Sequence, residues 1–200
     1  FFYYTNLVNI YLVLYLLFFY LYNFLTKNFF LIDIAFLTSF YILRLYYGSE
    51  LIGINISYWF LFFFTTLFLI FSTFKRIIQI SMNSLVSKNK IIAYSQNHYP
   101  LLKKIVIIST IVNLCIFVLY LYELAYPNTF ASFSAPETRY EQNILILCII
   151  FFLYSFGLIR IIRLVFNKKI KQDIYLFALK DKLNYIFLIV YFLFFYFYMN

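Results

Sequence analysis

The chain has 200 residues, of which 66% are hydrophobic and 12% are charged, and its mean hydropathy is +0.90. A soluble domain of this length cannot bury so much apolar side chain, because its surface needs far more polar cover. The composition therefore excludes an ordinary soluble domain and indicates an integral membrane protein. The net charge of +9 does not indicate a nucleic-acid partner, because membrane topology and anionic lipid headgroups already account for the bases.

Six apolar runs follow one another along the chain, each close to the roughly 20 residues that cross a bilayer core of about 30 Å. The runs are continuously apolar rather than alternating, which predicts helices and not a membrane barrel. We expect an all-α membrane protein with a single transmembrane domain over residues 1–200. The expected spans are 8–25, 32–48, 57–74, 105–125, 143–163 and 184–199.

The connections between these runs differ in charge. Bases occupy the first, third and fifth connections, near 26–31, 75–104 and 164–183. The second connection carries Glu50, and the fourth has an excess of acids. Bases in every second connection are what six successive crossings require. The positive-inside rule then places the basic connections in the cytoplasm and the C-terminus outside.

Polar residues gather where the first span ends and the second begins. Tyr22 and Lys27 close the first span, and Asp33 opens the second. They form either a site at one rim of the bundle or an ordinary interfacial belt. Arg44 lies inside the second span, where a charge costs about 2.5–3.5 kcal/mol even on the lenient insertion scale. We expect Arg44 to line a polar cavity, unless it snorkels to the interface or pairs with Glu50.

Lys75 and Arg76 directly follow the third span, and Gln79 comes about one helical turn later. Two adjacent bases at a membrane exit are either snorkelling anchors or a phosphate-binding pair. The apolar residues spread through 77–92 indicate an interfacial amphipathic segment.

Asp181 stands between Lys180 and Lys182 at the entry to the last span, where it balances these lysines or helps to hold a cation. Cys115 and Cys148 lie in apolar runs and are expected to be small buried hydrophobes. The sequence has no GxxxxGK[ST] or GxGxxG phosphate loop, and no DxxD or DxxxD pair that would form a two-carboxylate magnesium site.

The segment 22–48, YNFLTKNFFLIDIAFLTSFYILRLYYG, resembles the YSxxLK…lDv…fvlRv..G stretch of decaprenyl-phosphate phosphoribosyltransferases, a branch of the UbiA prenyltransferase superfamily. Ser57-Tyr58-Trp59 resembles the S-x-W motif of that branch, and residues 74–79 resemble its KRxxE motif, with Gln79 in place of Glu. Residues 154–160 are similar to its YG..R stretch, and 180–183 to its D-r/k-x-L element. The matches follow in order across nearly the whole chain.

The resemblance implies a bundle of about nine transmembrane helices around a cavity that opens to the cytoplasm. The six runs would be the last six helices, and 75–104 would be the second cytoplasmic active-site loop. It also implies that an N-terminal part precedes Phe1. The aspartate-rich motif that binds Mg²⁺ and diphosphate in this family would lie in that part, so no metal ligand is expected within residues 1–200.

The function that the resemblance implies is transfer of 5-phosphoribosyl from phosphoribosyl diphosphate to a polyprenyl phosphate, with Mg²⁺, in a bacterial inner membrane. Without the upstream part, residues 1–200 alone are expected to be inactive. The implied catalytic residues are Lys75, Arg76 and Arg44. The implied substrate contacts are Tyr22, Lys27, Asp33, Gln79 and Asp181. Two alternatives remain open: a UbiA-type prenyltransferase that joins a prenyl diphosphate to an aromatic acceptor, and a non-enzymatic transporter of polyprenyl lipids.

Overall fold

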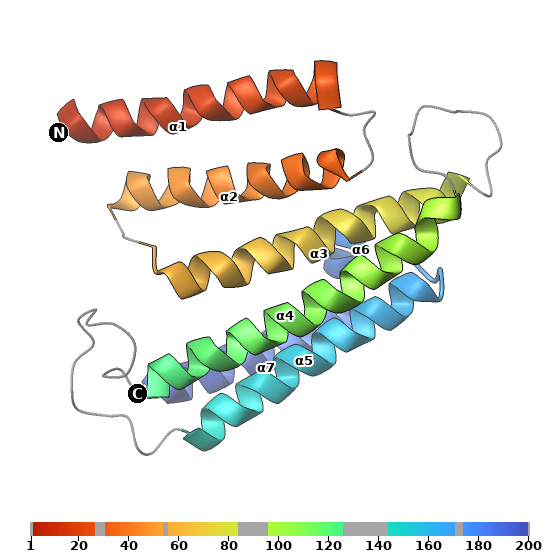
Figure 1. Cartoon of the computed structure of the whole chain (residues 1–200). Coiled ribbons are helices and arrows are strands. Elements are labelled where there is room, and N and C mark those ends of the chain that lie inside the picture. Colours follow the sequence, from red (N-terminus) through yellow and green to blue (C-terminus); the bar gives the residue numbers. More distant parts are fainter. Residues whose placement is uncertain are drawn as a thin grey trace. The chain divides into compact units, whose positions relative to one another are not determined.

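The structure is a computed structural model that describes residues 2–26, 31–53, 56–83, 96–125, 144–170 and 174–199. Within these residues the chain forms seven α-helices and no strand (Figure 1). The helices are α1 (Phe2–Leu21), α2 (Ile32–Ile52), α3 (Tyr58–Asn83), α4 (Tyr99–Ala125), α5 (Ile144–Phe166), α6 (Ile174–Lys180) and α7 (Lys182–Met199). A π-helical turn, η1 (Tyr22–Thr26), follows α1, and a 3₁₀ turn, η2 (Gln96–His98), precedes α4.

Three helical segments among the described residues have the length and composition of membrane spans. They are Tyr58–Met82, Gln96–Tyr122 and Ile146–Phe166, and Ile10–Phe24 is a shorter apolar helix. Only 39%, 22% and 17% of the three most apolar windows are buried within the protein. Most of their side chains therefore face outward, which is stable in lipid and not in water. The prediction of an all-α membrane bundle is confirmed, and its six long runs correspond to the six long helices.

The chain divides into two compact units, Phe1–Thr110 and Ile111–Asn200. In the first unit, α1, α2 and α3 lie side by side and run in alternating directions, with α2 packed against both neighbours (Figure 1). Aromatic pairs join the helices: the Tyr15 and Phe40 rings are 5.3 Å apart between α1 and α2, and the Tyr41 and Phe68 rings stack at 4.8 Å between α2 and α3.

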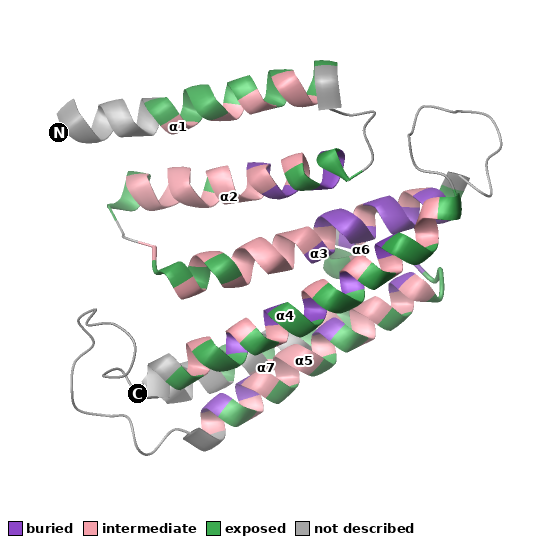
Figure 2. Cartoon of the chain, in the orientation of Figure 1, coloured by how far each residue is buried: buried purple, intermediate pink, exposed green. Residues whose placement is uncertain are grey.

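The core of the first unit gathers on the C-terminal half of α3 (Figure 2). Ile70, Phe74 and Ile77 are fully enclosed there. The sequence predicted that the third span ends near residue 74, but α3 continues to Asn83. Its last turns are buried, because Ile77, Ile78 and Ile80 pack inside the protein. Residues 77–83 of the predicted interfacial segment therefore form the last turns of α3; their location at the membrane interface stays a prediction, and 84–92 lie outside the described residues.

The second unit contains the end of α4 together with α5, α6 and α7. The Phe117 and Tyr154 rings lie 4.6 Å apart between α4 and α5, and α5 packs against α7. Cys115 and Cys148 are free and exposed on α4 and α5. The prediction that they are buried is wrong, because an apolar run in a membrane helix does not show which of its faces points toward lipid.

Candidate functional site

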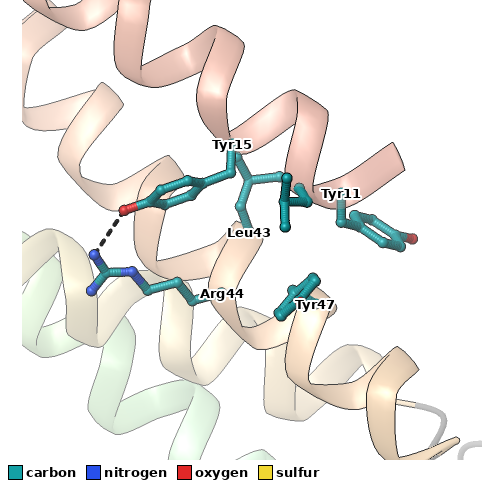
Figure 3. A pocket seen from close by; sticks show the side chains of 6 residues that line it. Tyr11, Tyr15, Leu43, Arg44 and Tyr47 are labelled. Carbon is teal, nitrogen blue, oxygen red and sulfur yellow. Dashed lines mark hydrogen bonds between the residues drawn. The ribbon is translucent and has the colours of Figure 1, made fainter. Parts of the chain in front are cut away.

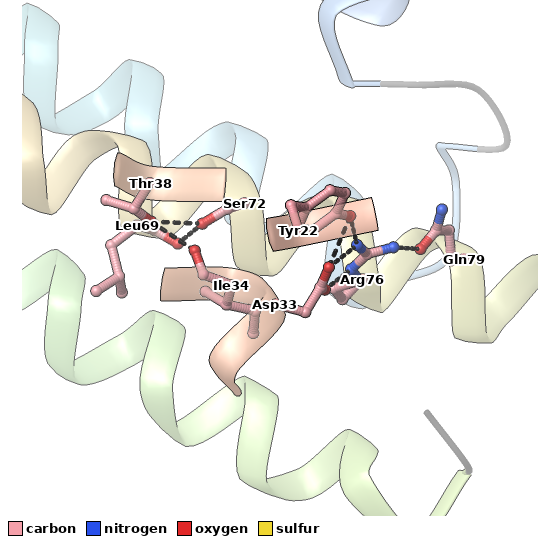
Figure 4. A network of polar contacts seen from close by, with 8 residues as sticks. All are labelled: Tyr22, Asp33, Ile34, Thr38, Leu69, Ser72, Arg76 and Gln79. Atoms are coloured by element: carbon pink, nitrogen blue, oxygen red, sulfur yellow. Dashed lines mark hydrogen bonds and ion pairs between the residues drawn. The ribbon is translucent and has the colours of Figure 1, made fainter. Parts of the chain in front are cut away.

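Four of the predicted site residues meet at one end of the first unit (Figure 4). Tyr22 comes from the π-helical turn after α1, Asp33 from the first turn of α2, and Arg76 and Gln79 from the C-terminal half of α3. Because the three helices alternate in direction, the end of α1, the start of α2 and the end of α3 lie at the same end of the unit. We call these four residues the Arg76 network.

Arg76 is bound on several sides by the protein itself. Its Nε and Nη2 donate to the two carboxylate oxygens of Asp33. Nη2 also donates to the Tyr22 hydroxyl at 3.0 Å, and that hydroxyl donates to Asp33 Oδ1 at 2.8 Å. Nη1 donates to Gln79 Oε1. The guanidinium charge is thus balanced by a carboxylate before any ligand is considered.

Both charged groups of the Arg76–Asp33 ion pair are buried, so the pair matters for the stability of the fold. The Asp33 side chain has no exposed surface and that of Arg76 is 8% exposed. Removing an ionised group from water carries a penalty of several kcal/mol, which only a well-placed counter-charge and further hydrogen bonds offset. The two-pronged arginine–carboxylate contact supplies both. The Arg76 network therefore holds the ends of three helices together.

The local sequence explains how the network forms. Asp33 lies in the first turn of α2, where the helix dipole favours a negative charge. Arg76 and Gln79 are three residues apart on α3 and so are neighbours on one helix face. Further along the same α2–α3 contact, the buried Thr38 and Ser72 hydroxyls lie 3.1 Å apart. The sequence reading missed this pair, because serine and threonine in an apolar run carry no charge to draw attention.

Lys75 and Lys27 are not part of the described network. Lys75 is half-buried and adjacent to Arg76 on α3, about 100° around the helix from it. Lys27 lies outside the described residues. Lys75 therefore lies beside the Arg76 network, and none of the network's hydrogen bonds involves it.

Arg44 lies elsewhere on α2 (Figure 3). Asp33 and Arg44 are separated by about 16 Å along the helix at 1.5 Å per residue. The partner of Arg44 is the Tyr15 hydroxyl, to which Nη2 donates at 2.8 Å, and not Glu50. Its guanidinium carbon also lies 5.6 Å and 5.8 Å from the ring centres of Tyr15 and Tyr41. Arg44 is therefore not part of the Arg76 network, and it lies between α1 and α2.

Asp181 lies in the second unit, between α6 and α7. Its Oδ2 accepts from Arg160 Nη2, and Arg160 Nη1 donates to Asn184 Oδ1 at 2.8 Å. Asp181 also caps α7 by accepting from the Leu183 backbone N–H at 3.2 Å. Its ion-pair partner is therefore Arg160, and not the flanking lysines that the sequence reading proposed. A charge inside the fifth apolar run was a signal that could have singled out Arg160.

The described residues do not form a magnesium site. No group of three or more His, Cys, Asp or Glu side chains that could hold a metal ion occurs among them. Both oxygens of Asp33 are engaged by Arg76, and Asp181 is paired with Arg160.

No model of a known protein family and no curated protein matches this chain. The fold and composition define its class, an all-α membrane protein.

Proposed function

We propose that the chain is the membrane-embedded part of a transferase that moves 5-phosphoribosyl from phosphoribosyl diphosphate to a polyprenyl phosphate. The observation that carries this proposal is the convergence of the Arg76 network. Tyr22 and Asp33 belong to one stretch that resembles the phosphoribosyltransferase branch of the UbiA superfamily, and Arg76 and Gln79 belong to another. The two segments that carry the resemblance therefore supply residues that bind one another, since Asp33 and Arg76 are in contact although they are 43 residues apart in the sequence.

The reaction would require one bond exchange. An oxygen of the lipid phosphate forms a bond to the anomeric carbon of the sugar, while the bond from that carbon to diphosphate breaks. The diphosphate leaves with the bonding electrons, and the lipid phosphate becomes a phosphodiester. Catalysis of this kind depends on positioning and on charge stabilisation at the phosphates.

The contacts of Arg76 favour a different role for it from the one that the sequence implied. The Arg76 guanidinium is paired with Asp33 and also bonds Tyr22 and Gln79. It is therefore better suited to positioning the surrounding helices than to holding a phosphate. In our proposal Arg76 fixes the ends of α1, α2 and α3, and Lys75 beside it contacts a phosphate of the donor or of the lipid. Lys27 remains a proposed second phosphate contact, and Gln79 and Tyr22 are proposed to face the sugar.

Mg²⁺ is expected to accompany the diphosphate in this family, but the described carboxylates do not fit a magnesium site. We therefore assign no part of the reaction to a metal held by these residues.

The experiment is a donor assay on membranes that contain the full-length protein. We expect label from phosphoribosyl diphosphate to pass into a lipid-extractable product when polyprenyl phosphate is supplied. Lys75→Ala should raise KM for a phosphorylated substrate about tenfold or more, as expected for loss of one charge-assisted contact. Lys169→Ala, which removes an exposed lysine in the second unit, is the matched control. Use of a prenyl diphosphate with an aromatic acceptor instead would contradict the phosphoribosyl assignment.

The same engagement of Arg76 favours a second candidate, a non-enzymatic membrane protein that moves polyprenyl lipids. In such a protein the buried ion pair would serve only to hold the bundle together. This candidate predicts no consumption of either donor by folded protein, and transport of polyprenyl phosphate between leaflets that Lys75→Ala leaves unchanged.

A further inference from the structure

A pocket opens between α1 and α2 around Arg44 (Figure 3). Its volume is about 290 Å³, and it is lined by Tyr11, Leu12, Tyr15, Leu43, Arg44 and Tyr47. This volume is at the lower end of the range for small-molecule sites. It accommodates a headgroup and the first carbons of a chain, but not a whole lipid.

The polar groups of the pocket favour an anion. Arg44 donates to the Tyr15 hydroxyl at 2.8 Å. The Tyr15 oxygen is therefore used as an acceptor, and its own proton remains to be donated. Arg44 also keeps further N–H groups, since a guanidinium has five. The pair thus presents donors and one positive charge, and a phosphate offers the matching acceptors.

Arg44 has no carboxylate partner within the described part of the chain. Its neutral contacts are the hydroxyl of Tyr15 and the faces of the Tyr15 and Tyr41 rings. This contrasts with Arg76 and Arg160, each of which is paired with an aspartate. An unpaired cation in an apolar span is costly unless it reaches the interface or an anion neutralises it.

The position of the pocket points to the bilayer as the source of that anion. Leu12 on its wall is 44% exposed, and Leu16 one turn further along α1 is 55% exposed. Apolar side chains exposed in this way face lipid in a membrane protein. Arg44 lies about 12 Å along α2 from the end of the helix at Ile52, and a long basic side chain in that region reaches toward the headgroup layer.

We propose that this pocket binds the phosphate headgroup of an anionic phospholipid from the surrounding bilayer. Arg44 and Tyr15 hold the phosphate, and Leu12 and Leu43 contact the start of an acyl chain. The site is separate from the Arg76 network, and it does not depend on the proposed transferase function.

Native mass spectrometry of the purified full-length protein tests the assignment. The probes are phosphatidylglycerol and phosphatidylcholine with identical acyl chains, presented in equal amounts. We expect the protein to retain phosphatidylglycerol in preference, and Arg44→Ala to lower that retention about tenfold, as expected for loss of a charge-assisted contact. Arg44→Lys should keep part of the binding, because it retains the charge without the planar fork. Tyr15→Phe should lower binding a few-fold.

Arg163→Ala is the matched control, because it removes an exposed arginine of the second unit. Equal losses in Arg44→Ala and Arg163→Ala would mean only general attraction to anionic lipid and would overturn the site. Arg44-dependent retention of inorganic phosphate or of polyprenyl phosphate, but not of phosphatidylglycerol, would show that the bound anion is not a bilayer phospholipid and would overturn the proposal. If Arg44→Ala does not fold, Leu43→Trp fills the pocket and keeps Arg44. Undiminished binding in that variant would also overturn the proposal.

Discussion

Arg76 and Asp33 form a two-pronged ion pair although they are 43 residues apart in the sequence. The carboxylate is fully enclosed and the arginine side chain nearly so. The pair joins the start of α2 to the C-terminal half of α3, and Tyr22 connects it to the end of α1. Arg76, which the resemblance implied as a catalytic residue, and Asp33, which it implied as a substrate contact, therefore bind each other.

Breaking this pair from one side should strongly destabilise the first unit. Asp33→Asn leaves a buried guanidinium without its counter-charge, which typically reduces the free energy of unfolding by about 3–5 kcal/mol. Denaturation of the detergent-solubilised protein by increasing SDS would measure the loss. Glu50→Gln is the matched control, because Glu50 is not in an ion pair among the described residues, and it should change stability by less than about 0.5 kcal/mol.

The double variant Asp33→Asn with Arg76→Gln provides a second check. It removes both charges and should be more stable than Asp33→Asn alone, because no unpaired charge remains buried. If the single and double variants were equally unstable, loss of packing rather than of charge pairing would be the cause.

The sequence predicted the helices better than it predicted their ends. Composition and span length were sufficient for the six long helices, because a bilayer selects for apolar runs of that length. The end of α3 was misplaced because Lys75 and Arg76 look like the boundary of a span. Arg76 is neutralised by Asp33 from another helix, so α3 continues with its isoleucines buried. A local hydrophobic pattern does not predict contacts between residues that are distant in sequence.

The candidate site shows the same limit. Sequence reasoning selected Tyr22, Asp33, Arg76 and Gln79 as polar groups that need an explanation, since charges are rare in membrane helices. It did not predict that they bind one another. For Arg44 it considered Glu50 as the partner, whereas the structure has Tyr15, and a tyrosine among 22 in the chain gives no signal of such a contact.

The ion pair of the second unit should contribute less than the one in the first. The side chains of Arg160 and Asp181 are 20% and 15% exposed, so water partly solvates both. Arg160→Ala should lower the free energy of unfolding by about 1 kcal/mol. The loss should shrink at high salt, whereas the loss in Asp33→Asn should change little because a buried pair is screened less. Melting curves of both variants at low and high ionic strength would compare the two, and equal salt dependence would contradict this expectation.

The contact between Asn113 and Tyr154 should have a small effect despite its burial. The Tyr154 hydroxyl donates to Asn113 Oδ1, and Asn113 is fully enclosed between α4 and α5. Hydrogen bonds between membrane helices contribute on average about 0.6 kcal/mol in double-mutant cycles. We expect a coupling of that size between Asn113→Ala and Tyr154→Phe in SDS denaturation. Ser155→Ala is the control, since among the described residues Ser155 bonds the carbonyl of Phe152 in its own helix. A coupling above about 2 kcal/mol would contradict the membrane average.

Gly48 within α2 and Gly53 at its C-terminal cap should respond in opposite ways to the same substitution. Gly53 ends the helix with φ of 73°, and its N–H bonds the Glu50 carbonyl at 3.3 Å. An added methyl group meets no neighbour there, but the left-handed backbone disfavours any L side chain, so Gly53→Ala should lower stability by about 1 kcal/mol. Gly48 lies within the helix and also has open space around it. Gly48→Ala should therefore raise stability by roughly 0.5–1 kcal/mol, because alanine favours the helix. SDS denaturation of both variants would measure this difference in sign, and a stabilising Gly53→Ala would show that α2 does not end in the left-handed turn.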